Sequence, residues 1–109
     1  MKRFWTTIGL LTVLAGTSTA AEEGPVVGIR LFNFQPAKIE IKQGSMVTWT
    51  NQDDIRHTVT SGMPDKKDGK FGAPLAGRGT SFSFTFKESG TYTYFCDRHQ
   101  HMRGEIQVR

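Results

Sequence analysis

The sequence has very little cysteine and histidine. Its 109 residues include one cysteine, Cys96, and three histidines. A single cysteine cannot form a disulfide within the chain, although exported proteins normally use their cysteines in pairs. Cys96 is therefore a buried inert thiol, a reactive thiol, half of an intermolecular bridge or a metal ligand. Which of these roles applies has to be inferred from the residues around Cys96.

A dense positive face is also missing. The formal net charge is +4, and it falls to +2 when Lys2 and Arg3 are left out. Only Lys66, Lys67 and Lys70 cluster, and two aspartates lie among them. Binding of nucleic acid requires Lys and Arg concentrated on one face. We therefore predict no nucleic-acid partner, and we interpret the lysine cluster as part of a solvated loop.

The sequence lacks an apolar run of the roughly 20 residues that a membrane-spanning helix needs. The longest mostly apolar stretch, residues 4–16, is shorter and is interrupted by threonine. Two basic residues precede it and small residues follow it, which is the layout of a secretory signal peptide. We predict that residues 1–20 are removed on export, with cleavage after Ala20 or, as a second choice, after Ala21. The mature chain, residues 21–109, would have no membrane insertion.

Beyond residue 20 no segment has the periodicity of a long helix. Polar and apolar residues instead alternate with a period of two, as in strands with one buried face. Short strands separated by glycine-rich turns are typical of an all-β sandwich or barrel in a single domain. The segment 61–79, rich in glycine, proline and lysine, is interpreted as a long loop. The expected strands are residues 26–32, 38–42, 46–51, 58–60, 81–86, 91–95 and 105–108.

The alternation places six aromatic side chains on the inward faces of these strands. Each can bury roughly 150–250 Å², and a domain of this size needs that area for its core. We therefore predict that they form the core rather than an aromatic ligand-binding cage. They are Trp49, Phe82, Phe84, Phe86, Tyr92 and Tyr94.

The segment between the last two expected strands carries an uncommon set of side chains. Cys96, His99 and Met102 follow one another at three-residue intervals, so one short loop can direct all three toward one point. Thiolate and thioether suit copper(I), and two imidazoles, a thiolate and a long axial thioether form an electron-transfer copper site. Calcium and magnesium prefer oxygen ligands, and zinc gains little from a thioether. The set indicates copper.

A second imidazole has to come from elsewhere in the chain, and His57 is the only histidine outside this loop. It follows the strand that ends at Asn51 and precedes the expected strand 58–60, so it also lies at a strand end. An isolated loop histidine is more often solvated than bound to metal, but the Cys96–Met102 loop reverses this preference. We predict that His57 completes a site for one copper ion per chain, Cu+ or Cu2+.

Short motifs with a common pattern are spread over the whole mature chain. They are Phe34-Gln35-Pro36, Ile39-Glu40-Ile41, Gly44, residues 47–51, His57-Thr58-Val59 and the series Tyr94, Cys96, His99, Met102, Gly104, Ile106 and Val108. Together they resemble a plastocyanin-type cupredoxin, and the short ligand loop is most similar to that of amicyanin. The resemblance implies a Greek-key β-sandwich of about seven or eight strands with copper near one pole. It also implies the ligands His57, Cys96, His99 and Met102.

Four positions differ from the pattern of that family. Thr58 replaces an asparagine that often follows the first ligand histidine. Arg98 and Gln100 replace prolines that stiffen the loop in amicyanin-like proteins. His101 replaces an apolar residue, and we interpret it as a solvated loop histidine. These differences concern the stiffness of the loop and the reduction potential rather than the metal.

Two further residues have competing interpretations. Asn51 either connects the His57 loop to the ligand loop by hydrogen bonds or caps a turn. Met63 is interpreted as an isolated surface residue rather than a second copper-binding thioether.

The resemblance implies a periplasmic, exported type 1 (blue) copper protein that carries one electron at a time between redox partners. The partners would be redox proteins of the cytochrome or dehydrogenase type, and the protein would act as a monomer. The electron would leave through the exposed edge of His99. The residues expected to form an apolar docking surface are Pro36, Met63, Phe71, Pro74 and Leu75.

Two other functions fit the same ligands less well. A protein for copper storage or delivery would favour exposed clusters of methionine and histidine, and the chain has no methionine-rich tract. A copper enzyme needs a further copper with an open position. Because two of the three histidines are already assigned, the chain cannot supply that site. We therefore predict that the protein is not an enzyme.

Overall fold

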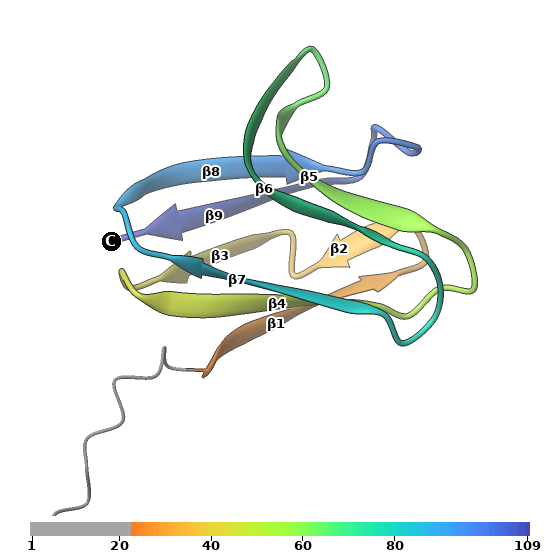
Figure 1. Cartoon of the computed structure of the whole chain (residues 1–109), viewed down its shortest axis with the longest axis horizontal. Helices are drawn as coiled ribbons and strands as arrows, with labels where there is room; N and C mark the ends of the chain where they lie inside the picture. Colours follow the sequence, from red (N-terminus) through yellow and green to blue (C-terminus); the bar gives the residue numbers. More distant parts are fainter. Residues whose placement is uncertain (1–22) are drawn as a thin grey trace, which may run out of the picture.

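Residues 23–109 are described by a computed structural model (Figure 1). The predicted signal peptide, residues 1–20, and its cleavage site lie outside the described residues. Within residues 23–109 no helix has the length and apolar composition needed to cross a membrane. The strands of the described part are β1 (Glu23–Arg30), β2 (Asn33–Gln35), β3 (Lys38–Ile41), β4 (Ser45–Asn51), β5 (His57–Met63), β6 (Lys66–Leu75), β7 (Ser81–Phe86), β8 (Gly90–Phe95) and β9 (Arg103–Val108).

These strands form two sheets that pack face to face. One sheet has the order β2-β1-β4-β7 and the other β3-β9-β8-β5-β6. Strands β1 and β4 run parallel, as do β3 and β9, and the other paired neighbours are antiparallel. The predicted all-β sandwich is confirmed, with nine strands in the described residues rather than seven or eight (Figure 1).

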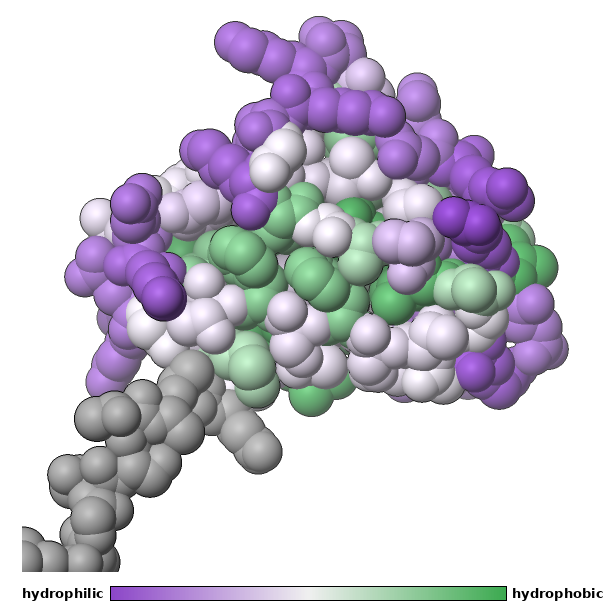
Figure 2. Space-filling model, in the orientation of Figure 1, coloured by the Kyte–Doolittle hydropathy of each residue, from purple (hydrophilic) through white to green (hydrophobic). Residues whose placement is uncertain are grey.

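The core between the sheets is built from the residues that alternate inward. Trp49 in β4 is fully buried. Its ring stacks on Phe71 and Phe82 at centroid distances of 5.7 and 5.6 Å, and it meets Tyr94 edge-on at 5.4 Å. Of the six rings predicted to face inward, half are buried and half pack against the core from its margin. Figure 2 shows an apolar band across the middle of the molecule, bordered by polar side chains.

The prediction of a loop over residues 61–79 is wrong for most of that length. β5 continues to Met63, and β6 pairs with it in an antiparallel hairpin that extends beyond the sandwich in Figure 1. A register shift precedes Gly62, and the φ angles of Gly62, Gly69 and Gly72 are 104°, 67° and 151°. Glycine adopts these angles readily. The glycines and charges that suggested a loop belong to a bulged hairpin.

Three connections lie at one end of the sandwich, on the right in Figure 1. They are the turn Leu31–Phe32 between β1 and β2, residues 52–56 between β4 and β5, and residues 96–102 between β8 and β9. His57, the first residue of β5, lies at the same end. The two sequence segments that carry the predicted ligands are thereby brought together.

Candidate metal centre

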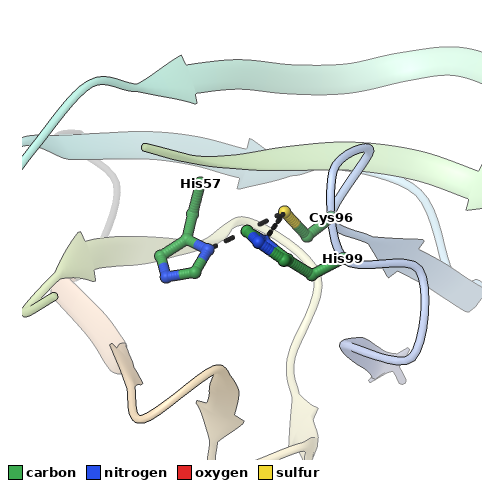
Figure 3. Close-up of side chains that lie close together, drawn as sticks. All are labelled: His57, Cys96 and His99. Atoms are coloured by element: carbon green, nitrogen blue, oxygen red, sulfur yellow. Dashed lines mark hydrogen bonds between the residues drawn. The ribbon is translucent and has the colours of Figure 1, made fainter. Parts of the chain in front are cut away.

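Three of the four predicted ligands converge at this end (Figure 3). The Nδ1 atom of His57 lies 3.8 Å from the sulfur of Cys96, and the Nδ1 atom of His99 lies 3.7 Å from it. The three donor atoms lie within 4.8 Å of one another. The same nitrogen of each imidazole therefore faces the thiol.

The spacing of these atoms fits a trigonal metal site. Bonds of about 2.0 Å to imidazole and about 2.3 Å to thiolate, set 120° apart, place nitrogen and sulfur about 3.7 Å from each other. The observed separations of 3.7 and 3.8 Å match this value. Two imidazoles and one thiolate in trigonal arrangement are the donor set of an electron-transfer copper.

The four predicted ligands differ in exposure. His57 and Cys96 are fully buried and Met102 is 1% exposed, whereas His99 is only partly buried. Met102 donates its backbone N–H to the carbonyl of His99 at 2.8 Å and accepts from the N–H of Cys96 at 3.2 Å. The thioether is thus carried by the same closed loop as the thiol. One imidazole edge remains accessible to the surface.

The ligand loop is closed by its own hydrogen bonds rather than by proline. Besides the two backbone bonds that Met102 makes with Cys96 and His99, the side chain of Arg103 donates from Nε to the carbonyl of Gln100 at 3.1 Å. Further out, Gly104 lies opposite Tyr94 in the β8–β9 register. A Cβ atom on Gly104 would overlap the Tyr94 ring. The ends of the loop are therefore fixed by close packing.

Thr58 takes the position in which the resembling family often has asparagine, and it still connects the two ligand segments. Its backbone N–H points to the Cys96 sulfur at 3.4 Å, and its hydroxyl accepts from the N–H of Asp97 at 2.8 Å. The hydroxyl of Thr60 donates to the Asp97 carboxylate at 3.0 Å, and Lys67 pairs with that carboxylate at 2.9 Å. The start of β5 is thus linked to the residue that follows the thiol.

Asp53 was not identified from the sequence. Its Oδ2 atom lies 2.8 Å from Nε2 of His57. The same carboxylate accepts from the backbone N–H of Leu31 at 2.9 Å and of Phe32 at 3.2 Å. Partial burial acts to raise the pKa of Asp53, but the hydrogen bonds from His57 and the two amides outweigh it and hold that pKa below its ordinary value. Asp53 therefore contacts the buried imidazole as a carboxylate.

Phe32 covers both imidazoles. Its ring meets His57 edge-on at 5.5 Å and His99 edge-on at 4.9 Å between centroids. Leu31 and Phe32 have φ angles of 50° and 60°, which are uncommon for residues with large side chains. Both side chains are exposed, Phe32 at 41%. No sequence pattern marked this turn as part of the site.

The comparisons with known proteins agree with this geometry. Residues 25–109 match the family model of copper-binding proteins of the plastocyanin/azurin family. The chain belongs to this family. Over 100 residues it is 36% identical to amicyanin-alpha of Methylorubrum extorquens. The alignment covers 86% of this chain and 82% of that relative.

Solved structures of cupredoxins have the same fold. The amicyanin of Paracoccus versutus aligns with a TM-score of 0.70 at 30% identity, over 81% of this chain and 83% of that one. A purple cupredoxin from Nitrosopumilus maritimus aligns with a TM-score of 0.71 at 28% identity, over 79% of this chain and all of that one. Cupredoxins of this family bind one copper ion and carry electrons. The predicted fold, cofactor and electron-carrier function are thereby confirmed.

The third histidine of this cupredoxin lies beside the site without contributing to it. His101 is exposed, as predicted, and its ring centroid is 6.5 Å from that of His99. Burial lowers the pKa of His99 below its ordinary value, and repulsion from His57, His101 and Arg98 lowers it further. The accessible imidazole therefore favours its neutral form, in which it can donate a lone pair.

Asn51 does not connect to the ligand loop, so that interpretation is wrong. Its side-chain amide donates to the carbonyls of Ile55 at 2.8 Å and Leu75 at 3.1 Å, and its oxygen accepts from the N–H of Asp53 at 2.9 Å. Asn51 thus shapes the turn that carries Asp53 and ties it to the end of β6. The turn-capping interpretation is the one that the structure supports.

The predicted docking surface needs correction as well. Phe71 and Leu75 are buried in the core, because they are the two residues of the otherwise largely exposed strand β6 that pack into the core cluster. Pro36, Met63 and Pro74 are exposed, as expected for surface residues. The exposed large apolar side chains of the connections at the metal end are Leu31, Phe32 and Ile55.

Proposed function

We propose that His57, Cys96, His99 and Met102 hold the copper ion of this electron carrier. The observation that carries the proposal is the convergence of two Nδ1 atoms on the Cys96 sulfur at 3.8 and 3.7 Å. Met102 would supply the weak axial thioether from its buried position on the same loop. When bound, the copper supplies a one-electron couple between Cu+ and Cu2+.

The chain's contribution is to hold the donor atoms in place in both oxidation states. His57 and Cys96 are fixed at the ends of strands and have no exposure. The ligand loop is closed by the hydrogen bond from the N–H of Cys96 to the carbonyl of Met102 and by the one from the N–H of Met102 to the carbonyl of His99. An electron carrier needs little rearrangement between its two states, and contacts around the ligands keep the geometry fixed.

Electrons would enter and leave at His99, because it is the ligand side chain that is only partly buried. Phe32 contacts its ring, and Leu31 and Ile55 add exposed apolar surface on the neighbouring connections. The partners would be redox proteins of the cytochrome or dehydrogenase type, and the carrier itself would be a monomer without enzymatic activity. We place it in the periplasm, because the first 20 residues have the sequence of a signal peptide.

Copper storage or delivery is the less supported function. A donating site would expose its ligands to a receiving protein, whereas three of the four proposed ligands here are at most 1% exposed. An enclosed site favours retention of the ion.

The absorption spectrum of copper(II)-loaded protein tests the assignment. A thiolate ligand in a trigonal site gives an intense visible charge-transfer band, and Cys96→Ser should abolish it because it removes the only thiolate. His101→Ala is the matched control, since it changes an exposed residue of the same loop and should leave the band intact. A Cys96→Ser protein that retained the band would contradict the ligand assignment.

A further inference from the structure

Asp53 offers one carboxylate to three donors at the metal end of the sandwich. Oδ2 faces Nε2 of His57 at 2.8 Å, while the two oxygens accept from the N–H groups of Leu31 and Phe32. We propose that Asp53 is a positioning residue of the copper centre, which fixes the orientation and tautomer of His57 and holds the Leu31–Phe32 turn over both imidazoles. This inference rests on the proposed ligand set.

The contact with His57 determines which nitrogen is free to bind metal. An ionised carboxylate can only accept hydrogen bonds, and a neutral imidazole carries one N–H. The N–H of His57 must therefore be at Nε2, where Asp53 lies. Nδ1, which faces the Cys96 sulfur at 3.8 Å, keeps its lone pair. His57 has no exposure, so bulk water cannot replace Asp53 without rearrangement.

The contact with the turn links the same carboxylate to the cover of the site. Leu31 and Phe32 both have positive φ, a conformation that an aromatic or branched residue adopts only when its surroundings hold it there. The two backbone N–H groups are held by the two oxygens of Asp53. Phe32 in turn contacts the rings of both histidines. The Asp53 side chain thus orients the ligand His57 and also the turn whose Phe32 covers it.

The carboxylate also changes how strongly His57 donates. A hydrogen bond from the distal N–H of a ligand imidazole to a carboxylate raises the basicity of the ligating nitrogen. A more basic nitrogen favours copper(II) over copper(I), so Asp53 lowers the reduction potential. Removing its charge while keeping its shape should raise the potential.

Asp54 provides a matched control. It is the next residue, it carries the same charge, and its carboxylate pairs with Arg78 on the surface at 2.8 Å. Its side chain is 79% exposed, against 13% for Asp53. Asp53→Asn and Asp54→Asn therefore make the same change in net charge close to the site, but only the first alters the contact with His57.

The variants are compared by copper(II) affinity, visible spectrum and reduction potential. Loss of such an outer contact typically costs 10–100-fold in metal affinity, and we expect about this loss of copper(II) affinity for Asp53→Asn. Each tenfold loss that is specific to copper(II) raises a one-electron potential by about 59 mV. Asp54→Asn should leave affinity and spectrum unchanged. Equal shifts in the two variants, or no shift in Asp53→Asn, would overturn the proposal.

A measurement on the unsubstituted protein keeps the proposal testable if Asp53→Asn does not fold. Nitrogen-15 NMR of the copper-free protein at about pH 8, where imidazole is ordinarily neutral, identifies the protonated nitrogen of His57. We expect Nε2–H in slow exchange with water. A proton on Nδ1 would refute the role of Asp53 even if copper binds at Cys96. Absence of the thiolate band in copper-loaded protein would instead contradict the proposed ligand set.

Discussion

The two imidazoles that face the Cys96 sulfur are held in contrasting ways. His57 begins a strand, has no exposure, and meets the Asp53 carboxylate with its second nitrogen. His99 lies in the middle of a seven-residue loop and is partly exposed. No hydrogen bond of its second nitrogen is found among the described residues. The buried side of the site, with His57, therefore fixes the geometry of the donor atoms, whereas the side with His99 is accessible from the surface.

Replacing each imidazole by glycine should give the largest difference between the two sides. His57→Gly removes a buried side chain, and we expect it to lower the free energy of unfolding by about 2–4 kcal/mol because of the cavity and the lost partner of Asp53. His99→Gly should cost about 1 kcal/mol or less, as for other exposed positions. Urea unfolding of the copper-free variants measures both values.

Added imidazole extends the same comparison. It should restore the visible band of copper-loaded His99→Gly, because the vacated position opens to solvent. It should do so poorly for His57→Gly, whose vacated position is enclosed. Equal rescue of both variants would show that the contrast in burial has no consequence for the metal.

The reduction potential should depend on pH through His99. Copper(I) is satisfied by three ligands, so a proton can compete for Nδ1 of the accessible imidazole in the reduced protein. Protonation then stabilises the reduced state, and the potential rises as the pH falls. Because the pKa of His99 already lies below its ordinary value, the rise should begin in mildly acidic solution and approach about 59 mV per pH unit.

Voltammetry from about pH 8 to about pH 5, a range that brackets the ordinary pKa of imidazole, measures this dependence. His101→Ala serves as the control, because His101 is an exposed histidine of the same loop that lies outside the group of His57, Cys96 and His99. A flat potential over this range would mean that the reduced site holds His99 as firmly as His57. If the rise disappeared in His101→Ala, the pH dependence would come from His101, and the prediction for His99 would be wrong.

Substitution of the axial side chain should have the smallest effect on binding. A long thioether bond contributes little to affinity, so Met102→Gln should change copper affinity by less than about tenfold. Its oxygen donor favours copper(II), and the potential should fall. An unchanged potential would show that Met102 is a core residue and not a ligand. The protein ligands would then be the two imidazoles and the thiolate alone.

The sequence predicted the elements whose side chains alternate over a full strand. β4 and β7 appear within one residue of the expected bounds, because polar and apolar residues alternate along both: β4 alternates between intermediate and buried positions from Met46 onward, and the first four residues of β7 alternate between exposed and partly buried positions. The hairpin of β5 and β6 was missed, because β6 is exposed along most of its length and alternation is absent there. Strand β2 is too short, at three residues, to show a period.

The donor set was predicted in advance, and its surroundings were not. Cys96, His99 and Met102 are close in sequence, and their chemistry together is uncommon enough to indicate a metal. In the sequence nothing distinguishes Asp53 from other loop aspartates, and its role becomes visible only from its contacts with the Leu31–Phe32 turn. That contact joins residues 22 and 21 positions apart, and no local pattern encodes it.

The close approach of Gly104 to the Tyr94 ring has a consequence for how such a protein can evolve or be redesigned. The pair fixes the strands at both ends of the ligand loop, so insertions or deletions between them need not propagate into the two sheets of the sandwich. The loop between them can therefore be replaced without changing the rest of the fold. Loops of different length and stiffness could be inserted between these two residues to change the reduction potential of the copper site while the two sheets stay the same.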